Sequence, residues 1–188
     1  MHMMLRARGF TLIELLITVT IFVFLIMLAG PMYAEFMANH QIRNASDAIL
    51  NGVQQAQSAA VRGNTLVRLL IDPSTGTGGW QVLQTIDGVE SATPVQIYTF
   101  HDGAPMITVT TKPDGARQIT FDGFGRVMSP KNVDGSDPVS CIKVTNGNIS
   151  NPHKLNVAII SNSRIGAAKL CDPAASSTEP QACPAECS

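Results

Sequence analysis

The hydrophobic residues of this chain follow three different patterns. Residues 10–29 form a nearly unbroken apolar run in which Glu14 is the only charged residue. After residue 32 the apolar positions are spaced as on one face of an α-helix, and polar residues fill most of the other positions. Together these two patterns predict one long helix over residues 10–62, ended by Gly63-Asn64. The apolar face of its second half consists of Phe36, Ile42, Ile49, Val53, Ala56 and Ala60.

The apolar run has the length of a membrane-spanning helix. Its 20 residues make about 30 Å of helix, which matches the hydrocarbon core of a bilayer. Arg6 and Arg8 precede it, and no Lys or Arg follows until Arg43, so the positive-inside rule predicts a cytoplasmic N-terminus and an exported C-terminal part. A cleaved secretory signal peptide is the alternative. The helical pattern continues past Gly30-Pro31, where we predict a bend, and this favours a retained helix.

After residue 63 the pattern changes to the alternation of β-strands. Asp122-Gly123 lies between two such segments and predicts a hairpin turn. The glycine-rich segment 75–79 also indicates a turn between strands, because no helix follows it as a phosphate-binding loop requires. From Asp172 onward the composition predicts an irregular tail. One helix followed by strands indicates an α+β fold in which antiparallel sheets pack on the helix. The expected strands are 67–71, 80–84, 95–100, 107–110, 118–121, 125–128, 141–144, 155–160 and 168–171.

All four cysteines lie late in the chain, at Cys141, Cys171, Cys183 and Cys187. An even number in an exported domain predicts two disulfides, for which three pairings exist. We favour Cys141–Cys171, which would join two predicted strands, with Cys183–Cys187, which would close a short loop in the tail. A zinc site with His153 as an additional ligand is the alternative, but the spacing of Cys141 and Cys171 matches no common zinc finger.

Apart from the zinc alternative, nothing in the sequence points to catalysis or to a bound metal or cofactor. The four histidines are scattered through the N-terminal segment, the helix and the loops, no serine lies in a nucleophile elbow, and no pair of acidic residues has a catalytic spacing. The formal net charge of −1 gives no general electrostatic attraction to nucleic acid. We therefore expect a structural or binding protein rather than an enzyme.

The N-terminal segment carries a more specific signal. The stretch Gly9-Phe10-Thr11-Leu12-Ile13-Glu14-Leu15-Leu16 resembles the prepilin-type signal of type IV pilins and pseudopilins. This resemblance implies that a membrane-bound prepilin peptidase cuts after Gly9 and methylates the new N-terminal Phe10. It also makes Glu14 the fifth residue of the mature chain and matches Pro31 to the helix-kinking proline of the family.

Glu14 needs a physical reason, because a carboxylate at the centre of a bilayer costs roughly 3 kcal/mol on insertion scales. In a packed filament it can pair with the positive N-terminal amine of a neighbouring subunit, and this pairing offsets the cost of burying both charges. Alternatively, its side chain extends to the nearby cytoplasmic interface. The two roles are compatible, one in the membrane and the other in the filament.

Two segments of the second half narrow the family. Residues 56–64 resemble the helix end, and residues 119–127 the mid-domain hairpin, of the GspH/FimT/FimU class of minor pilins and pseudopilins. This resemblance implies a non-enzymatic subunit that is anchored once in the inner membrane, with a cytoplasmic N-terminus, and is then drawn into a filament in the periplasm and at the cell surface. The implied partners are other minor and major pilins, the prepilin peptidase and the inner-membrane assembly platform. Two systems fit: a type IV pilus, in which such subunits prime assembly and sit at the tip, and the pseudopilus of type II secretion.

The expected organisation has four parts. Residues 1–9 are the leader peptide, residues 10–31 the membrane and filament-core helix, residues 32–62 the amphipathic second half of the helix, and residues 63–188 an exported β domain whose tail is tied down by disulfides. Removal of the leader changes the formal net charge from −1 to −3.

A further resemblance concerns DNA. FimT, one branch of the class, binds DNA through a Gly-Arg-x-Arg motif before a late cysteine. The matching stretch here is Gly166-Ala167-Ala168-Lys169-Leu170-Cys171, in which Ala167 replaces the first arginine, and Arg164 just upstream is its substitute. The alternative is that the cations of this region are ordinary solvated side chains, because non-specific DNA affinity needs several phosphate contacts. The candidate DNA contacts are Arg164, Lys169, Lys154 and Arg126.

Overall fold

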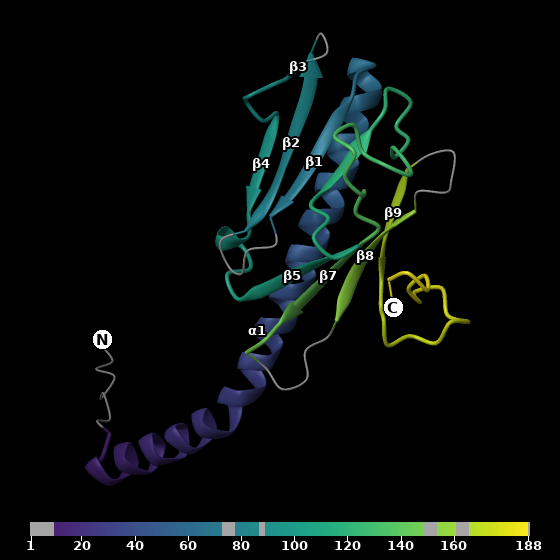
Figure 1. The fold of residues 1–188 in the computed structure, drawn as a ribbon. Coiled ribbons are helices and arrows are strands. Elements are labelled where there is room, and N and C mark those ends of the chain that lie inside the picture. The colour runs from purple at the N-terminus through teal and green to yellow at the C-terminus, as the bar shows by residue number, and fades with distance from the viewer. Residues whose placement is uncertain (1–9, 73–77, 87–88, 149–153, 161–165, 188) are drawn as a thin grey trace, which may run out of the picture. The chain divides into compact units, whose positions relative to one another are not determined.

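The structure, a computed structural model, describes residues 10–72, 78–86, 89–148, 154–160 and 166–187. Helix α1 (Leu12–Gly63) begins two residues after the predicted start and ends one residue after the predicted end. The chain divides into two compact units, residues 1–37 and 38–188, so α1 runs from the first unit into the second (Figure 1).

In the first unit the large apolar side chains of α1 are all exposed, from Leu12 at 82% to Met37 at 41%. Among the described residues, no single helix is both long enough and apolar enough to cross a membrane. One bent pair, residues 12–28 together with residues 32–63, meets the criteria by length and composition alone.

In the second unit α1 buries one stripe of mostly apolar residues. This confirms the predicted apolar face with one exception: Phe36 is 59% exposed, because it lies in the first unit, before the buried part of the helix begins at Ala38. Ser46 lies on the stripe and donates its hydroxyl to the Ile42 carbonyl at 2.9 Å, so its polar group is satisfied inside the core. The stripe consists of Ala38, Ile42, Ala45, Ser46, Ile49, Val53, Ala56 and Ala60, each at most 6% exposed.

The first sheet is antiparallel. Its strands are β1 (Val67–Asp72), β2 (Gly79–Ile86), β3 (Val89–Glu90), β4 (Gln96–Thr99) and β6 (Gln118–Phe121). β1 lies between β2 and β6, and β2 also pairs with both short strands. A short 3₁₀ helix, η1 (Phe100–Asp102), follows β4. Alternation turns Val67, Leu69 and Ile71 of β1 toward the core, where all three are fully buried.

The second sheet is also antiparallel, with the strand order β5-β7-β8-β9. Its strands are β5 (Ile107–Lys112), β7 (Cys141–Asn146), β8 (Leu155–Ile160) and β9 (Ala167–Cys171). Ile142, Val144 and Val157 face inward and join the same hydrophobic cluster as the α1 stripe and the first sheet. Because one core holds the helix and both sheets together, the α+β fold predicted from the sequence is confirmed.

One predicted strand is absent. Val127 in the segment 125–128 forms only an isolated bridge to the end of β6. Asp122 closes a tight turn here, since its side chain accepts two backbone N–H groups. The backbone of this segment still bonds β6, since the Met128 N–H donates to the Thr120 carbonyl at 2.9 Å, but Asn132 Oδ1 accepts the N–H of Thr120 at 3.1 Å. The other eight predicted strands are confirmed with ends that agree within two residues. β3 was not predicted, because two residues are too few to form an alternating pattern in the sequence.

Candidate functional site: the N-terminal segment and the capped second sheet

Helix α1 begins at the segment that carries the predicted processing signal. Gly9 lies outside the described residues, and Phe10 is 78% exposed just before the helix. Thr11 caps the helix: its Oγ1 accepts the backbone N–H of Glu14 at 3.3 Å, and its carbonyl accepts that of Leu15 at 3.1 Å. The pattern Thr-x-x-Glu is a capping-box sequence, a helix-start signal that the sequence interpretation missed.

Glu14 is exposed in the first turn of α1. A carboxylate in this turn is favoured by the positive end of the helix dipole. The hydrogen bond between Glu14 and Thr11 uses the backbone N–H of Glu14 and not its side chain. It therefore leaves the carboxylate available for the expected pairing with a neighbouring subunit. That pairing stays a prediction, as does the kinking role of Pro31, which lies within α1.

Residues 10–37 present far more apolar surface than a water-exposed helix normally carries. A monomeric soluble protein rarely exposes contiguous apolar patches above a few hundred Å². Here the exposed large side chains cover the whole circumference of α1, since they occur at nearly every position from Phe10 to Leu28. Such a surface is suited to lipid or to other apolar helices.

Gln57 of α1 joins three segments of the second unit. Its Nε2 donates to the carbonyl of Gly125 at 2.8 Å and to that of Gly166 at 2.6 Å, and the Gly166 N–H donates to the Gly125 carbonyl at 3.1 Å. A Cβ atom on Gly166 would lie 2.8 Å from the Val127 side chain and 3.1 Å from the Phe121 ring. Gly166, the first residue of the stretch compared with the DNA-binding motif, therefore has a structural role: it lets the chain entering β9 approach the turn after β6.

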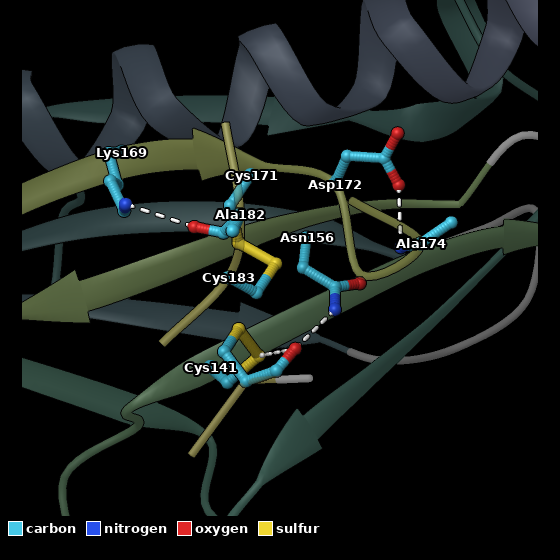
Figure 2. Close-up of a disulfide and its surroundings, with 9 residues drawn as sticks. Cys141, Asn156, Lys169, Cys171, Asp172, Ala174, Ala182 and Cys183 are labelled. Atoms are coloured by element: carbon cyan, nitrogen blue, oxygen red, sulfur yellow. Dashed lines mark hydrogen bonds between the residues drawn. A yellow bond between two sulfur atoms is a disulfide. The ribbon is translucent and has the colours of Figure 1, made fainter. Parts of the chain in front are cut away.

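Residues 172–187, here called the C-terminal cap, fold onto the outer face of the second sheet (Figure 2). Two disulfides hold the cap, Cys141–Cys187 and Cys171–Cys183, with Cα atoms 5.3 and 4.9 Å apart. Two disulfides are thus confirmed, and the favoured pairing is wrong. β8 lies between β7, which carries Cys141, and β9, which carries Cys171. Two strand spacings make about 10 Å, which exceeds the roughly 7 Å that a disulfide can bridge between Cα atoms.

Side chains of the sheet also bind the cap. Asn156 is buried and donates from Nδ2 to the Cys187 carbonyl at 2.6 Å, and Lys169 Nζ donates to the Ala182 carbonyl at 3.1 Å (Figure 2). Carbonyl groups of the cap therefore accept hydrogen bonds from polar side chains of β8 and β9. The cap itself forms no strand among its described residues, and its one bridge joins Asp172 to Ala182.

The sulfur atoms of Cys171, Cys183 and Cys187 lie within 4.8 Å of one another, because the two disulfides are adjacent. Thiolates bind zinc, whereas these sulfurs are oxidised in S–S bonds in the structure. The zinc alternative also named His153, which lies outside the described residues.

The four candidate DNA contacts do not form one patch in the described part of the chain. Arg126 is engaged locally: it pairs with Asp122 at 2.7 Å and lies over the Phe124 ring at 5.1 Å. Lys169 binds the cap, and Arg164 lies outside the described residues. Lys154 is exposed just before β8.

Arg126 also changes the acidity of its partner. Partial burial raises the pKa of Asp122, but the backbone N–H and the guanidinium of Arg126, together with the backbone N–H of Phe124, outweigh this effect. The pKa of Asp122 consequently lies below the usual aspartate value. Since Arg126 is used in this turn, it is poorly placed to give its full charge to a nucleic acid.

Lys154 instead belongs to a group that sequence reasoning missed. Lys112 of β5, Lys143 of β7 and Lys154 lie on the same outer face of the second sheet and are here called the lysine cluster. Burial lowers the pKa of Lys143 most, a side-chain hydrogen bond with Lys112 lowers it next, and the charges of Lys112 and Lys154 lower it further. Only the strand register brings the three residues together, so a linear reading of the sequence contains no signal for the cluster.

A polar hollow of about 240 Å³ lies on the outer face of the first sheet. Arg68 lines it and pairs with Glu90, and its Nη1 donates to Gln118 Oε1 at 2.8 Å. The Nε atom of Arg68 is buried without a partner among the described atoms. The other charged and polar groups that line the hollow mainly bind one another. Among the described residues, the hollow therefore shows no arrangement of acid, base and nucleophile.

Comparison with known families gives two matches. Residues 45–148, more than half of the chain, match the family model described as type II transport protein GspH, and residues 4–30 match the prokaryotic N-terminal methylation motif. No curated protein matches the chain.

Two solved structures are similar in fold. The type IV minor pilin FimU of Pseudomonas aeruginosa strain PAO1, in a crystal of space group P21, is 17% identical with a TM-score of 0.52, and the match covers 72% of this chain and 91% of FimU. The same protein in space group P65 is 16% identical with a TM-score of 0.48, over 68% of this chain and 90% of FimU. The family match over more than half of the sequence, the methylation motif and the FimU-like fold agree: the chain belongs to the GspH family and is a pilin of the GspH/FimT/FimU type.

Proposed function

We propose that the chain is a minor type IV pilin that takes part in priming pilus assembly and is incorporated in the filament, near its tip. As a member of a structural family it is a filament subunit rather than an enzyme. The observation that carries the proposal is the FimU-like fold over 91% of that minor pilin, on a chain with an N-terminal methylation motif.

The first step of this function is processing. A prepilin peptidase removes residues 1–9 and methylates Phe10, which is exposed ahead of the helix and therefore accessible. Residues 10–31 hold the subunit in the inner membrane with its N-terminus on the cytoplasmic side, and the β domain that follows residue 63 is exported. The assembly platform then moves the subunit from the membrane into the filament.

The second step is packing in the filament. Burial of exposed apolar side chains against other helices contributes about 25 cal/mol per Å², so the apolar surface of residues 10–37 drives association once it leaves the lipid. Glu14 supplies the register, because a buried carboxylate is tolerated only beside a positive group such as the N-terminal amine of a neighbour.

Mass spectrometry tests the proposal on filaments sheared from the producing cells. We expect the mature chain in this fraction, with N-methyl-Phe10 as its first residue. An N-terminus at another residue, or absence of the chain from the filaments, contradicts the proposal.

The second candidate function is a pseudopilin of type II secretion, and the description of the matching family model supports it. A deletion strain separates the two systems. Loss of surface pili and twitching supports the pilus, whereas loss of exoprotein secretion with normal pili supports the pseudopilus.

DNA binding stays a prediction. Gel-shift titration of the chain with duplex DNA at low salt tests it, because phosphate contacts weaken as the salt concentration rises. Retardation that disappears in the double variant Arg164→Ala, Lys169→Ala supports the role. Absence of retardation at low salt contradicts it.

A further inference from the structure

The two disulfides of the C-terminal cap lie close together on the outer face of the second sheet (Figure 2). The sulfur of Cys187, which is bonded to Cys141, lies within 4.8 Å of both sulfurs of the Cys171–Cys183 bond. A thiolate exchanges with a disulfide by direct attack on one of its two sulfur atoms, so a third sulfur nearby is the first requirement for exchange. The cap meets this requirement at Cys187.

The four cysteines differ in their exposure to solvent. Cys141, Cys171 and Cys187 are each at most 1% exposed, whereas Cys183 is half-buried. Access decides which sulfur of a disulfide is attacked. A reagent in solution therefore reaches the cap at Cys183, and the bond between Cys141 and Cys187 offers it no exposed residue.

Hydrogen bonds of the backbone hold Cys187 in place without its own disulfide. Asn156 Nδ2 donates to the Cys187 carbonyl at 2.6 Å, and the Cys187 N–H donates to the Pro184 carbonyl at 2.8 Å. Neither bond involves sulfur. A Cys187 thiol that is released from Cys141 is therefore still held beside the neighbouring disulfide.

Cys141 has a different position. It lies on β7, and β8 separates it from Cys171 on β9. Two strand spacings make about 10 Å between these Cα atoms, which is beyond the reach of a direct disulfide. Exchange between Cys141 and Cys171 therefore has to pass through Cys187.

We propose that the four cysteines form one route of thiol–disulfide exchange, which leads from solution to Cys183, then to Cys171, Cys187 and Cys141. An outside thiolate attacks Cys183 and forms a mixed disulfide, the Cys171–Cys183 bond breaks, and Cys171 leaves as a thiolate. This thiolate attacks Cys187, the Cys171–Cys187 bond forms, the Cys141–Cys187 bond breaks, and Cys141 leaves as a thiolate that takes up a proton. Each step forms one S–S bond and breaks one, so no further oxidant or reductant is needed. The reverse steps release the outside thiol and restore both bonds.

Cys183 is thereby a site of covalent modification by thiols, and the modification moves the free thiol to the buried β7. The inference concerns the chemistry of the cap alone. It holds equally for a pilus subunit and for a pseudopilus subunit, so its failure and the failure of the proposed function are independent.

The first experiment uses the full-length chain, purified in detergent. Cys141→Ser leaves Cys187 as a free thiol beside the Cys171–Cys183 bond. On the proposed route the Cys187 thiolate attacks Cys171 and releases Cys183, which iodoacetamide then alkylates irreversibly in the folded protein. Peptide mapping without reduction is expected to find alkylated Cys183 together with a Cys171–Cys187 crosslink.

Cys187→Ser is the matched control, because it removes the same disulfide but leaves its free thiol at Cys141. Thermal unfolding shows that both variants are folded. We expect at least about tenfold less alkylated Cys183 in the control, since only a thiolate held beside a disulfide reacts at a high effective concentration. Alkylation of Cys187 in the Cys141→Ser variant, with the Cys171–Cys183 bond intact, overturns the proposal.

The wild-type chain gives a second measurement that also decides the matter if Cys141→Ser does not fold. It is incubated with glutathione under native conditions, and acid stops the exchange because the thiolate is the attacking species. We expect chains that carry glutathione on Cys183, a Cys171–Cys187 crosslink and a free thiol at Cys141. Glutathione on Cys141 or Cys187, with the Cys171–Cys183 bond intact, overturns the proposed route.

Discussion

Gln57 Nε2 lies 2.6 Å from the carbonyl oxygen of Gly166, although the two residues are 109 positions apart in the sequence. The same amide group also reaches the carbonyl of Gly125 in the turn after β6. One helical side chain therefore links the helix to the first sheet and to the entrance of β9 in the second. Backbone carbonyls in a partly buried place need donors, and Gln57 supplies them.

Replacement of Gln57 by glutamate tests this link with little change in shape. The Gln57→Glu carboxylate cannot donate and would face two carbonyl oxygens, so we expect a loss of about 1–3 kcal/mol in the free energy of unfolding. Urea denaturation measures the loss. Gln54→Glu, on the exposed side of the same helix, is the control. An equal effect of both substitutions would show that charge on the helix, rather than the link, is responsible.

Gly52 is required where α1 meets the only tryptophan of the chain. A Cβ atom at Gly52 would lie 2.7 Å from Cε2 of Trp80, whose ring stacks on Tyr98 with centroids 5.8 Å apart. We expect Gly52→Ala to destabilise the domain by roughly 1–3 kcal/mol through overpacking, although alanine is the better helix former. Thermal unfolding followed by Trp80 fluorescence measures this effect. The control is Gly147→Ala, where a Cβ meets nothing within 4 Å. An unchanged or raised melting temperature of the Gly52 variant contradicts the argument.

Local patterns predicted the elements of this fold because each pattern reflects one local environment. The helical spacing of Ile42, Ile49 and Val53 reports the face that meets the sheets, and the alternation from Val67 to Ile71 reports one strand with one buried side. The missing strand after Gly123 shows the limit of this approach. There, the Asp122 side chain accepts the Arg126 N–H, which a regular hairpin ladder would bond to the opposite backbone.

The candidate site depends more on relations between distant residues. Whether Cys141 can reach Cys171 depends on β8 lying between their strands, and no local pattern contains that order. The lysine cluster likewise exists only through the register of β5, β7 and β8. The capping role of Thr11 was predictable, since the Thr-x-x-Glu pattern is local. The processing signal at Gly9 and Phe10 is recognised by another protein, the prepilin peptidase, and not by the fold of this chain. It was therefore predicted from a family resemblance and not from a structural pattern.

The disulfide pairing has a direct test. Proteolysis without reduction, followed by mass spectrometry, is expected to link the peptide of Cys141 to that of Cys187, and Cys171 to Cys183. Detection of a Cys141–Cys171 peptide would contradict the structure.

The two disulfides are also expected to differ in their contribution to stability. They span 46 and 12 residues, and in the chain-entropy model the longer loop stabilises by about 1 kcal/mol more. Unfolding of Cys141→Ser, Cys187→Ser should therefore need less urea than unfolding of Cys171→Ser, Cys183→Ser, where each double variant serves as the control for the other. The reverse order would show that contacts of the cap, rather than chain entropy, determine the difference.

The turn at Asp122 gives the domain a specific response to acid. The pKa of Asp122 lies below the ordinary value in the folded state, because hydrogen bonds from Arg126 and Phe124 outweigh the effect of burial. Above about pH 4 the carboxylate is ionised in both states and its contribution is fully present. As the pH falls below about 4, the unfolded chain takes up the proton first. The contribution decreases progressively and is gone once the pH is below the pKa of the folded state.

We expect wild type to exceed Asp122→Asn in stability by up to about 1 kcal/mol at pH 7, reduced by solvent screening, and the difference to shrink toward pH 3. Urea denaturation at both pH values measures it, with Asp114→Asn on an exposed loop as the control for loss of one negative charge. A difference that stays constant between pH 7 and pH 3 would mean that the Asp122 charge does not stabilise the turn, and that its side chain acts only as a neutral hydrogen-bond acceptor for the backbone.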